Sequence, residues 1–125
     1  MAHIVIMGAG LGGMPAAYEM RDKVDKKHKV TVVSDSENFQ FVPSNPWVAV
    51  KWRERAQVEM PVRKYLERKG IEFISTGVKR VHPDQNQLEL NDGKTVNYDY
   101  LVIATGPKLA FDEIEGFGPQ GHTHS

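Results

Sequence analysis

The chain has 125 residues, a length that suits one domain with a hydrophobic core. Its sixteen basic and sixteen acidic residues leave a formal net charge of zero, which argues against a partner held by net charge, such as nucleic acid or an anionic membrane. The absence of cysteine excludes disulfides, thiolate metal sites and a cysteine nucleophile within these 125 residues.

The first part of the chain predicts a βαβ unit. Residues 3–7 are apolar and rich in β-branched side chains, as in a strand that is buried on both faces. Glycines fill residues 8–13, and a helix is predicted from about 11 to 26, with Pro15 tolerated in its first turn. Residues 29–34 (KVTVVS) predict a second buried strand. A strand, a glycine turn, a helix and a strand in this order form a right-handed βαβ unit.

The glycine turn matches the spacing G-x-G-x-x-G of dinucleotide-binding domains. The first glycine permits a tight turn, the second lets the backbone approach a pyrophosphate, and the third lets helix and strand pack closely. A helix N-terminus adds N–H donors and a partial positive charge. A plain glycine-rich turn is the alternative, but the strand before and the helix after favour dinucleotide binding. The predicted pyrophosphate-binding residues are Gly8, Ala9, Gly10, Leu11, Gly12 and Gly13.

The end of the second strand is where such domains place an acidic residue on the adenosine ribose. Ser34 occupies that position here, and Asp35 follows it. A serine hydroxyl can bond a ribose hydroxyl, but without the charge assistance of a carboxylate. Asp35 can supply that carboxylate if the strand has already ended. No arginine follows closely, so a 2′-phosphate is not expected.

The remaining chain alternates irregular and regular segments. Residues 35–57 predict mainly a loop with one helical turn, residues 60–69 a helix with Pro61 in its first turn, and residues 71–75 a third core strand. Short alternating segments at 78–82, 87–90 and 95–98, separated by turn sequences, predict an antiparallel meander. Residues 100–105 return to a buried strand, and residues 112–125 predict an irregular tail after a domain of residues 1–111.

Two further motifs, together with the glycine turn, resemble those of a known protein family. The strand "YDYLVIATG" (98–106) ends in Ala-Thr-Gly, as in the FAD domain of flavoprotein reductases with two dinucleotide-binding domains. The loop "FQFVPSNPWV" (39–48), taken alone, predicts a hydrophobic loop that packs over its own domain. Together with "GGMPAAYEM" and "YLERKGIEFI", the motifs closely resemble sulfide:quinone oxidoreductases over nearly the whole chain.

The resemblance implies a fold and a cofactor, FAD. The fold is α/β: a Rossmann-like parallel sheet in the strand order 3-2-1-4, with helices on both faces, the meander (about 78–98) as crossover, and an incomplete FAD domain. Backbone groups after the third strand would line the adenine, and the Pro-Ser-Asn-Pro-Trp loop and the last core strand would approach the flavin. The residues that the resemblance adds to the predicted site are Val42, Pro43, Gly77, Val78, Ala104, Thr105 and Gly106.

The resemblance also implies a function for the whole enzyme. Members of this family use FAD to oxidise sulfide on cysteines and pass the electrons to a membrane quinone. Those cysteines, the second dinucleotide-type domain and the C-terminal membrane-seating helices come later than residue 125, so no catalytic residue is predicted in this chain, which alone is not expected to turn over. The whole enzyme is expected at the surface of a bacterial cytoplasmic membrane. This chain is expected to be soluble, without a signal peptide or membrane segment, and to self-associate through an uncovered sheet face.

Other interpretations remain open. The chain could be the FAD domain of a type II NADH dehydrogenase or of flavocytochrome c sulfide dehydrogenase, although the Pro-Ser-Asn-Pro-Trp loop argues against both. It could also be a nucleotide-binding module without catalysis. His122 and His124 are two apart near the end of the chain, where a solvated pair is favoured over a metal site, so no metal is predicted. Basic clusters at 21–29, 51–55 and 63–69 are interrupted by acidic residues, which predicts solvated faces.

Overall fold

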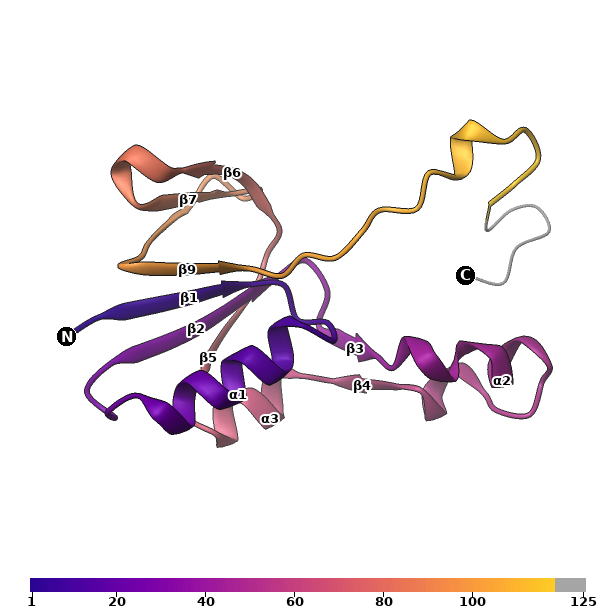
Figure 1. The fold of residues 1–125 in the computed structure, drawn as a ribbon, viewed down its shortest axis with the longest axis horizontal. Helices are drawn as coiled ribbons and strands as arrows, with labels where there is room; N and C mark the ends of the chain where they lie inside the picture. The colour runs from indigo at the N-terminus through magenta and orange to yellow at the C-terminus, as the bar shows by residue number, and fades with distance from the viewer. Residues whose placement is uncertain (119–125) are drawn as a thin grey trace. The chain divides into compact units, whose positions relative to one another are not determined.

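The computed structural model describes residues 1–118 (Figure 1). Within the described residues, the chain divides into two compact units. The first unit consists of residues 1–39 and 61–106, and it contains the βαβ unit and the meander. The second contains residues 40–60 and the described residues 107–118.

A four-stranded parallel sheet forms the centre of the first unit. Its strands are β1 (His3–Met7), β2 (Lys29–Ser34), β5 (Glu72–Ser75) and β9 (Tyr100–Ile103), in the order β5-β2-β1-β9. This order confirms the predicted arrangement of third, second, first and last core strand. All three pairings between neighbouring strands are parallel, so the carboxyl ends of the four strands lie along one edge of the sheet. The glycine turn follows β1 at this edge.

Two helices cover one face of this sheet (Figure 1). Helix α1 (Gly13–Lys23) follows β1, and helix α3 (Arg63–Arg68) precedes β5. Apolar side chains from both helices and three strands form one buried cluster. Its fully or almost fully buried members are Ile4, Ile6, Ala9, Met14, Ala17, Val30, Val32, Val62, Leu66, Ile71 and Phe73.

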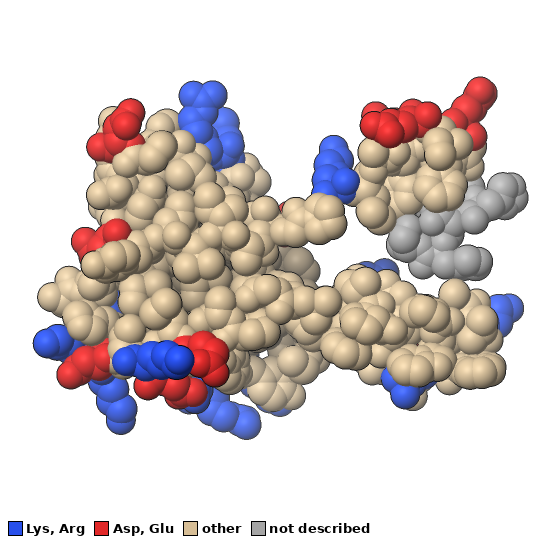
Figure 2. All heavy atoms as spheres, in the orientation of Figure 1, with Lys and Arg blue, Asp and Glu red and all other residues tan. Residues whose placement is uncertain are grey.

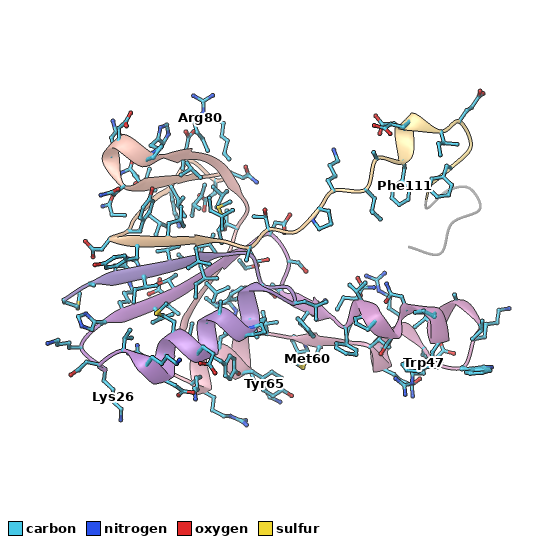
Figure 3. The ribbon with its side chains drawn as sticks, in the orientation of Figure 1. Lys26, Trp47, Met60, Tyr65, Arg80 and Phe111 are labelled. Carbon is cyan, nitrogen blue, oxygen red and sulfur yellow. The ribbon has the colours of Figure 1, made fainter. Side chains whose placement is uncertain are left out.

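The antiparallel meander covers the opposite face. It consists of β6 (Val78–His82), β7 (Gln87–Leu90) and β8 (Thr95–Asn97), in the order β6-β7-β8. A second buried cluster joins Leu88 and Leu90 of the meander to Val5 and Val33 of the sheet, and Figure 3 shows side chains filling the space between these layers.

The fold class is confirmed, but the expectation of helices on both faces needs one correction. In the described part of the first unit, both helices lie on the same face and the meander supplies the other layer. The alternating apolar residues of β7, which are buried at Leu88 and Leu90, give the meander the apolar face that a second helical layer would otherwise provide.

The segment between β2 and α3 holds more regular structure than a loop with one helical turn. Strands β3 (Asn38–Gln40) and β4 (Glu59–Pro61) form a two-stranded sheet. Pro61 therefore ends a strand instead of opening a helix, and α3 begins at Arg63 with Val62 as its N-cap residue. The Val62 N–H donates to the Glu37 carbonyl at 2.9 Å. The short helices of the second unit are η1 (Val42–Ser44), α2 (Asn45–Ala49), η2 (Arg55–Gln57) and η4 (Phe111–Glu113).

The amino-terminal edge of the sheet is held by polar side chains. His3 Nε2 lies 2.7 Å from the Thr31 hydroxyl, and the His3 N–H donates to the Asp99 carboxylate at 2.6 Å. Burial, followed by the nearby Lys29 ammonium, lowers the pKa of His3 below its ordinary value. The folded chain therefore favours the neutral imidazole, and His3 contributes less to stability as the pH falls below about 6.5, the ordinary histidine pKa.

The charged side chains of the first unit form mixed surfaces, as the interrupted basic clusters predict. Lys69 pairs with Asp22 at 2.6 Å and Lys23 with Glu19 at 3.6 Å, and blue and red atoms alternate over the region of α1 and α3 in Figure 2. Within residues 1–118, no helix combines the length and the apolar character needed to cross a bilayer.

Strand β9 forms one edge of the parallel sheet and carries exposed apolar side chains. Tyr100 is 66% exposed and Ile103 is 62% exposed. Exposed apolar edge strands favour pairing with other chains. Self-association of this chain stays a prediction.

Candidate dinucleotide-binding site

The glycine turn begins at the carboxyl end of β1, where Gly8 must be a glycine. Its N–H donates to the Val33 carbonyl of β2 at 2.8 Å, and its φ of 111° lies in the region that side chains disfavour. A β-carbon built on Gly8 would overlap the Ala104 carbonyl oxygen and lie 2.7 Å from the Ala104 carbonyl carbon. Gly8 therefore permits β1 and the chain after β9 to lie against each other.

Gly13 and Gly10 differ sharply in their surroundings. A β-carbon on Gly13, at the start of α1, would overlap the Gly8 carbonyl oxygen, so the helix packs on the turn only with glycine at this position. Gly10 is exposed, and a β-carbon built on it meets no heavy atom of the described chain within 4 Å. Folding explains Gly8 and Gly13 but leaves the absence of a side chain at Gly10 unexplained.

The N-terminus of α1 suits an anion. Its N-cap residue is Gly12, which offers no side-chain hydrogen bond, and the first turn contains no acidic residue. Met14 N–H bonds the Gly10 carbonyl at 3.0 Å, which turns the chain into the helix. Helix N-termini carry partial positive charge and N–H groups that need acceptors, so this end can hold a phosphate.

The residues after β9 lie beside the glycine turn. Their approach to a flavin stays a prediction. Ala104 N–H donates to the Met7 carbonyl at 2.8 Å, and a β-carbon on Gly12 would lie 3.6 Å from the Ala104 β-carbon. Thr105 is exposed, and Gly106 has a φ of 72°, in the left-handed region that favours glycine. The two glycine-containing motifs, distant in the sequence, therefore lie together at one edge of the sheet.

The predicted adenosine-binding residues lie at the carboxyl ends of β2 and β5. Ser34, the last residue of β2, is in register with Ser75 of β5. Asp35 follows the end of the strand, and a β-carbon built on Gly77 would lie 3.3 Å from the Asp35 β-carbon. Val78 begins β6 directly after Gly77. Because β2 ends at Ser34, the alternation of side chains along a strand does not force Asp35 to point away from Ser34.

Three polar residues near this edge were missed by the sequence interpretation. Arg63 donates to the Glu37 carboxylate at 3.0 Å and to the Phe73 carbonyl at 3.3 Å. The Arg63 hydrogen bond, and after it that of Ser75, lowers the pKa of Glu37. Asn91 follows β7 and lies beside Gly77. Such contacts join segments far apart in the chain, and no spacing in the sequence signals them; "NDGK" predicts only a turn.

Val42 and Pro43 belong to the second unit, where they begin η1. Val42 is 52% exposed, and the Ser44 N–H donates to the Phe41 carbonyl at 2.9 Å. In the same unit the Arg53 guanidinium stacks over the Trp47 ring at 4.3 Å; Figure 3 labels Trp47 on α2. The approach of Val42 and Pro43 to a flavin stays a prediction.

A match to a protein family covers residues 2–125, and that family is described as pyridine nucleotide-disulphide oxidoreductase. The chain belongs to this family. It is 40% identical over 109 residues to the sulfide-quinone reductase of Aquifex aeolicus (strain VF5), a match that covers 87% of this chain and 25% of that protein. It is 31% identical over 113 residues to the mitochondrial sulfide:quinone oxidoreductase of Dictyostelium discoideum, covering 90% of this chain and 25% of that protein.

A comparison of structures agrees with the family assignment. The X-ray structure of the Aquifex aeolicus sulfide:quinone oxidoreductase matches with a TM-score of 0.85 and 40% identity, over 89% of this chain and 26% of that chain. The chain therefore has the fold of the FAD domain in the flavoprotein disulphide oxidoreductase family, and it spans about a quarter of the length of these relatives.

Proposed function

We propose that this chain binds FAD, with the pyrophosphate at the glycine turn and the adenosine at the ends of β2 and β5. The observation that carries the proposal is the contrast within the turn. Gly8 and Gly13 are required by backbone contacts, whereas Gly10 is exposed with open space around it, at the N-terminus of a helix without a side-chain cap. An approaching phosphate gives Gly10 a reason to lack a side chain.

The residues present fit the cofactor that the family implies. The turn from Gly8 to Gly13 would hold the pyrophosphate, and Ser34 with Asp35 would hold the ribose hydroxyls. Ala104, Thr105 and Gly106 would line the path toward the flavin. Bound FAD supplies two-electron redox chemistry, while the residues of this chain bind and orient it. The chain has no cysteine and thus no thiolate nucleophile of its own.

A titration of the purified chain with FAD tests this proposal. We expect saturable binding, seen as a change in flavin fluorescence, and a rise in thermal stability, because a ligand at 100 times its dissociation constant stabilises the native state by about 2.7 kcal/mol. ADP, which carries the adenosine and the pyrophosphate, should compete with FAD, whereas riboflavin 5′-phosphate should compete poorly. A chain that is folded by circular dichroism and binds neither FAD nor ADP would contradict the proposal.

We also propose that, in a protein of the relatives' length, this domain carries the flavin between sulfide and a quinone. Support comes from the 40% and 31% identity to proteins named for that reaction, and from the Pro-Ser-Asn-Pro-Trp segment that contains Pro43 and Trp47.

A chimera tests this finer function. Residues 1–106 of this chain would replace the matching part of the Aquifex aeolicus enzyme, which would supply the remaining three quarters of the protein. We expect the chimera to retain FAD and to reduce a soluble quinone analogue in the presence of sulfide, at a rate within about tenfold of the parent, a difference in barrier of about 1.4 kcal/mol. A chimera with full flavin content and no sulfide-dependent quinone reduction would contradict the assignment.

A further inference from the structure

Asn91 lies beside Gly77, a contact that the turn sequence around Asn91 does not predict. Its N–H donates to the Gly77 carbonyl at 2.9 Å, and the next turn of the chain is closed by a bond from the Gly93 N–H to the Leu90 carbonyl at 3.1 Å. These two backbone bonds, one on each side, hold Asn91 at the point where β7 ends and β6 begins.

The side chain of Asn91 is directed toward the predicted adenosine end of the site. A β-carbon built on Gly77 would lie 2.5 Å from Asn91 Nδ2 and 3.3 Å from the Asp35 β-carbon. Both distances are measured to one point, so the carboxamide of Asn91 and the side chain of Asp35 flank Gly77 together. Asn91 and Asp35 are exposed to solvent, so a ligand can reach both of them.

The chemistry of this group suits adenine. A carboxamide presents a donor and an acceptor side by side, whereas a carboxylate presents acceptors only. The edge of adenine at N6 and N7 offers a donor and an acceptor in the same arrangement, and asparagine pairs with that edge in nucleic-acid recognition. Asp35 beside it has the opposite preference, for the hydroxyl donors of a ribose.

We propose that the Asn91 carboxamide hydrogen-bonds the adenine edge of the bound dinucleotide and makes the site selective for adenine. This inference rests on the proposed binding of FAD and adds a residue from the meander to the site. A purely structural role for Asn91, packing against Gly77, makes no distinction between adenine and another base.

Calorimetric titration of the whole chain with ADP and with inosine diphosphate separates these roles. Hypoxanthine carries an oxygen where adenine carries its amino group, so it cannot pair with the carboxamide in the same way. We expect the unmodified chain to bind ADP about fivefold more tightly than inosine diphosphate, the effect of one hydrogen bond. Asn91→Ala should weaken ADP binding about fivefold and remove the preference.

A second substitution of Asn91 and a control substitution at Asn97 test whether the effect is specific to the Asn91 carboxamide. Asn91→Leu keeps the approximate shape of the side chain without its polar atoms, and should lose the preference as Asn91→Ala does even if the alanine variant folds poorly. Asn97→Ala is the matched control, because Asn97 lies in the same meander and bonds the Gln87 side chain at 3.0 Å. This control should keep both the affinity for ADP and the preference for it.

The outcomes distinguish the two proposals. If the unmodified chain binds ADP without preferring it to inosine diphosphate, or if the Asn91 variants keep the preference, the assignment of Asn91 is wrong while FAD binding stands. If the folded chain binds neither FAD nor ADP, the proposed function itself is wrong. Loss of the preference in both Asn91 variants, with the Asn97 control unchanged, supports the assignment.

Discussion

Gly13→Ala should destabilise the first unit by about 3 kcal/mol or more and abolish the binding of FAD and ADP. The added β-carbon would overlap the Gly8 carbonyl oxygen, which is backbone and cannot move away as a flexible side chain can. Relief would require α1 to shift off the turn, and with it the buried Met14 and Ala17 that pack on the sheet. Urea denaturation followed by circular dichroism measures the loss of stability.

Gly10→Ala is the matched control in the same turn, with the opposite expectation. Gly10 does not have a positive φ, and a β-carbon there meets no atom of the described chain within 4 Å. The variant should fold with a stability within about 1 kcal/mol of the unmodified chain. Its affinity for FAD should nevertheless fall about tenfold or more, because the methyl group obstructs the approach of the pyrophosphate to the backbone.

The predictions for the two variants can be contradicted independently. A Gly13→Ala protein with unchanged stability would mean that the turn and the helix do not pack as the structure has them. A Gly10→Ala protein that binds FAD normally would be consistent with the described packing of the turn, but it would contradict the proposal that the pyrophosphate binds there.

The parallel sheet could be predicted from the sequence because each core strand is a continuous apolar run with a recognisable end. Residues 3–7 and 29–34 are observed as strands at the predicted bounds. The helix after the turn is shorter than predicted, Gly13–Lys23, because the two glycines at 10 and 12 belong to the turn and Val24 has an extended conformation. Local patterns locate buried strands well and helix ends poorly.

The arrangement around the proposed adenosine site could be predicted only in part. Ser34 ends β2, and Asp35 and Gly77 follow β2 and β5. The family resemblance supplies the order of these strands, so the three residues were expected to lie at one edge of the sheet. Asn91 and Arg63 were not found, because their positions depend on pairings between distant segments: β6 with β7 for Asn91, and Arg63 with Glu37. The sequence records the turn "NDGK" and a basic helix, but not which strand end each one meets.

Leu66→Ala is expected to lower the free energy of unfolding by about 3 kcal/mol. Together with a substitution in the meander, it tests whether the helical layer and the meander unfold together. Leu66 of α3 is fully buried in the cluster between helices and sheet, where truncation leaves a cavity. Glu67→Ala on the same helix is the control. Glu67 is 56% exposed and pairs with Arg63 at 3.6 Å, so this substitution should change stability by less than about 0.5 kcal/mol.

Leu88→Ala extends the same test to the opposite face of the sheet. Leu88 of the meander is also fully buried, and it packs in the cluster with Val33, whereas the neighbouring residue on β2, Val32, lines the cluster of Leu66. Because β2 is shared by both clusters, each leucine substitution should shift one common urea transition by about 3 kcal/mol. Two separate transitions in Leu88→Ala, one of them unshifted, would mean that the meander unfolds alone. Asn91, proposed to bind adenine, would then lie on a layer less stable than the sheet that carries Ser34.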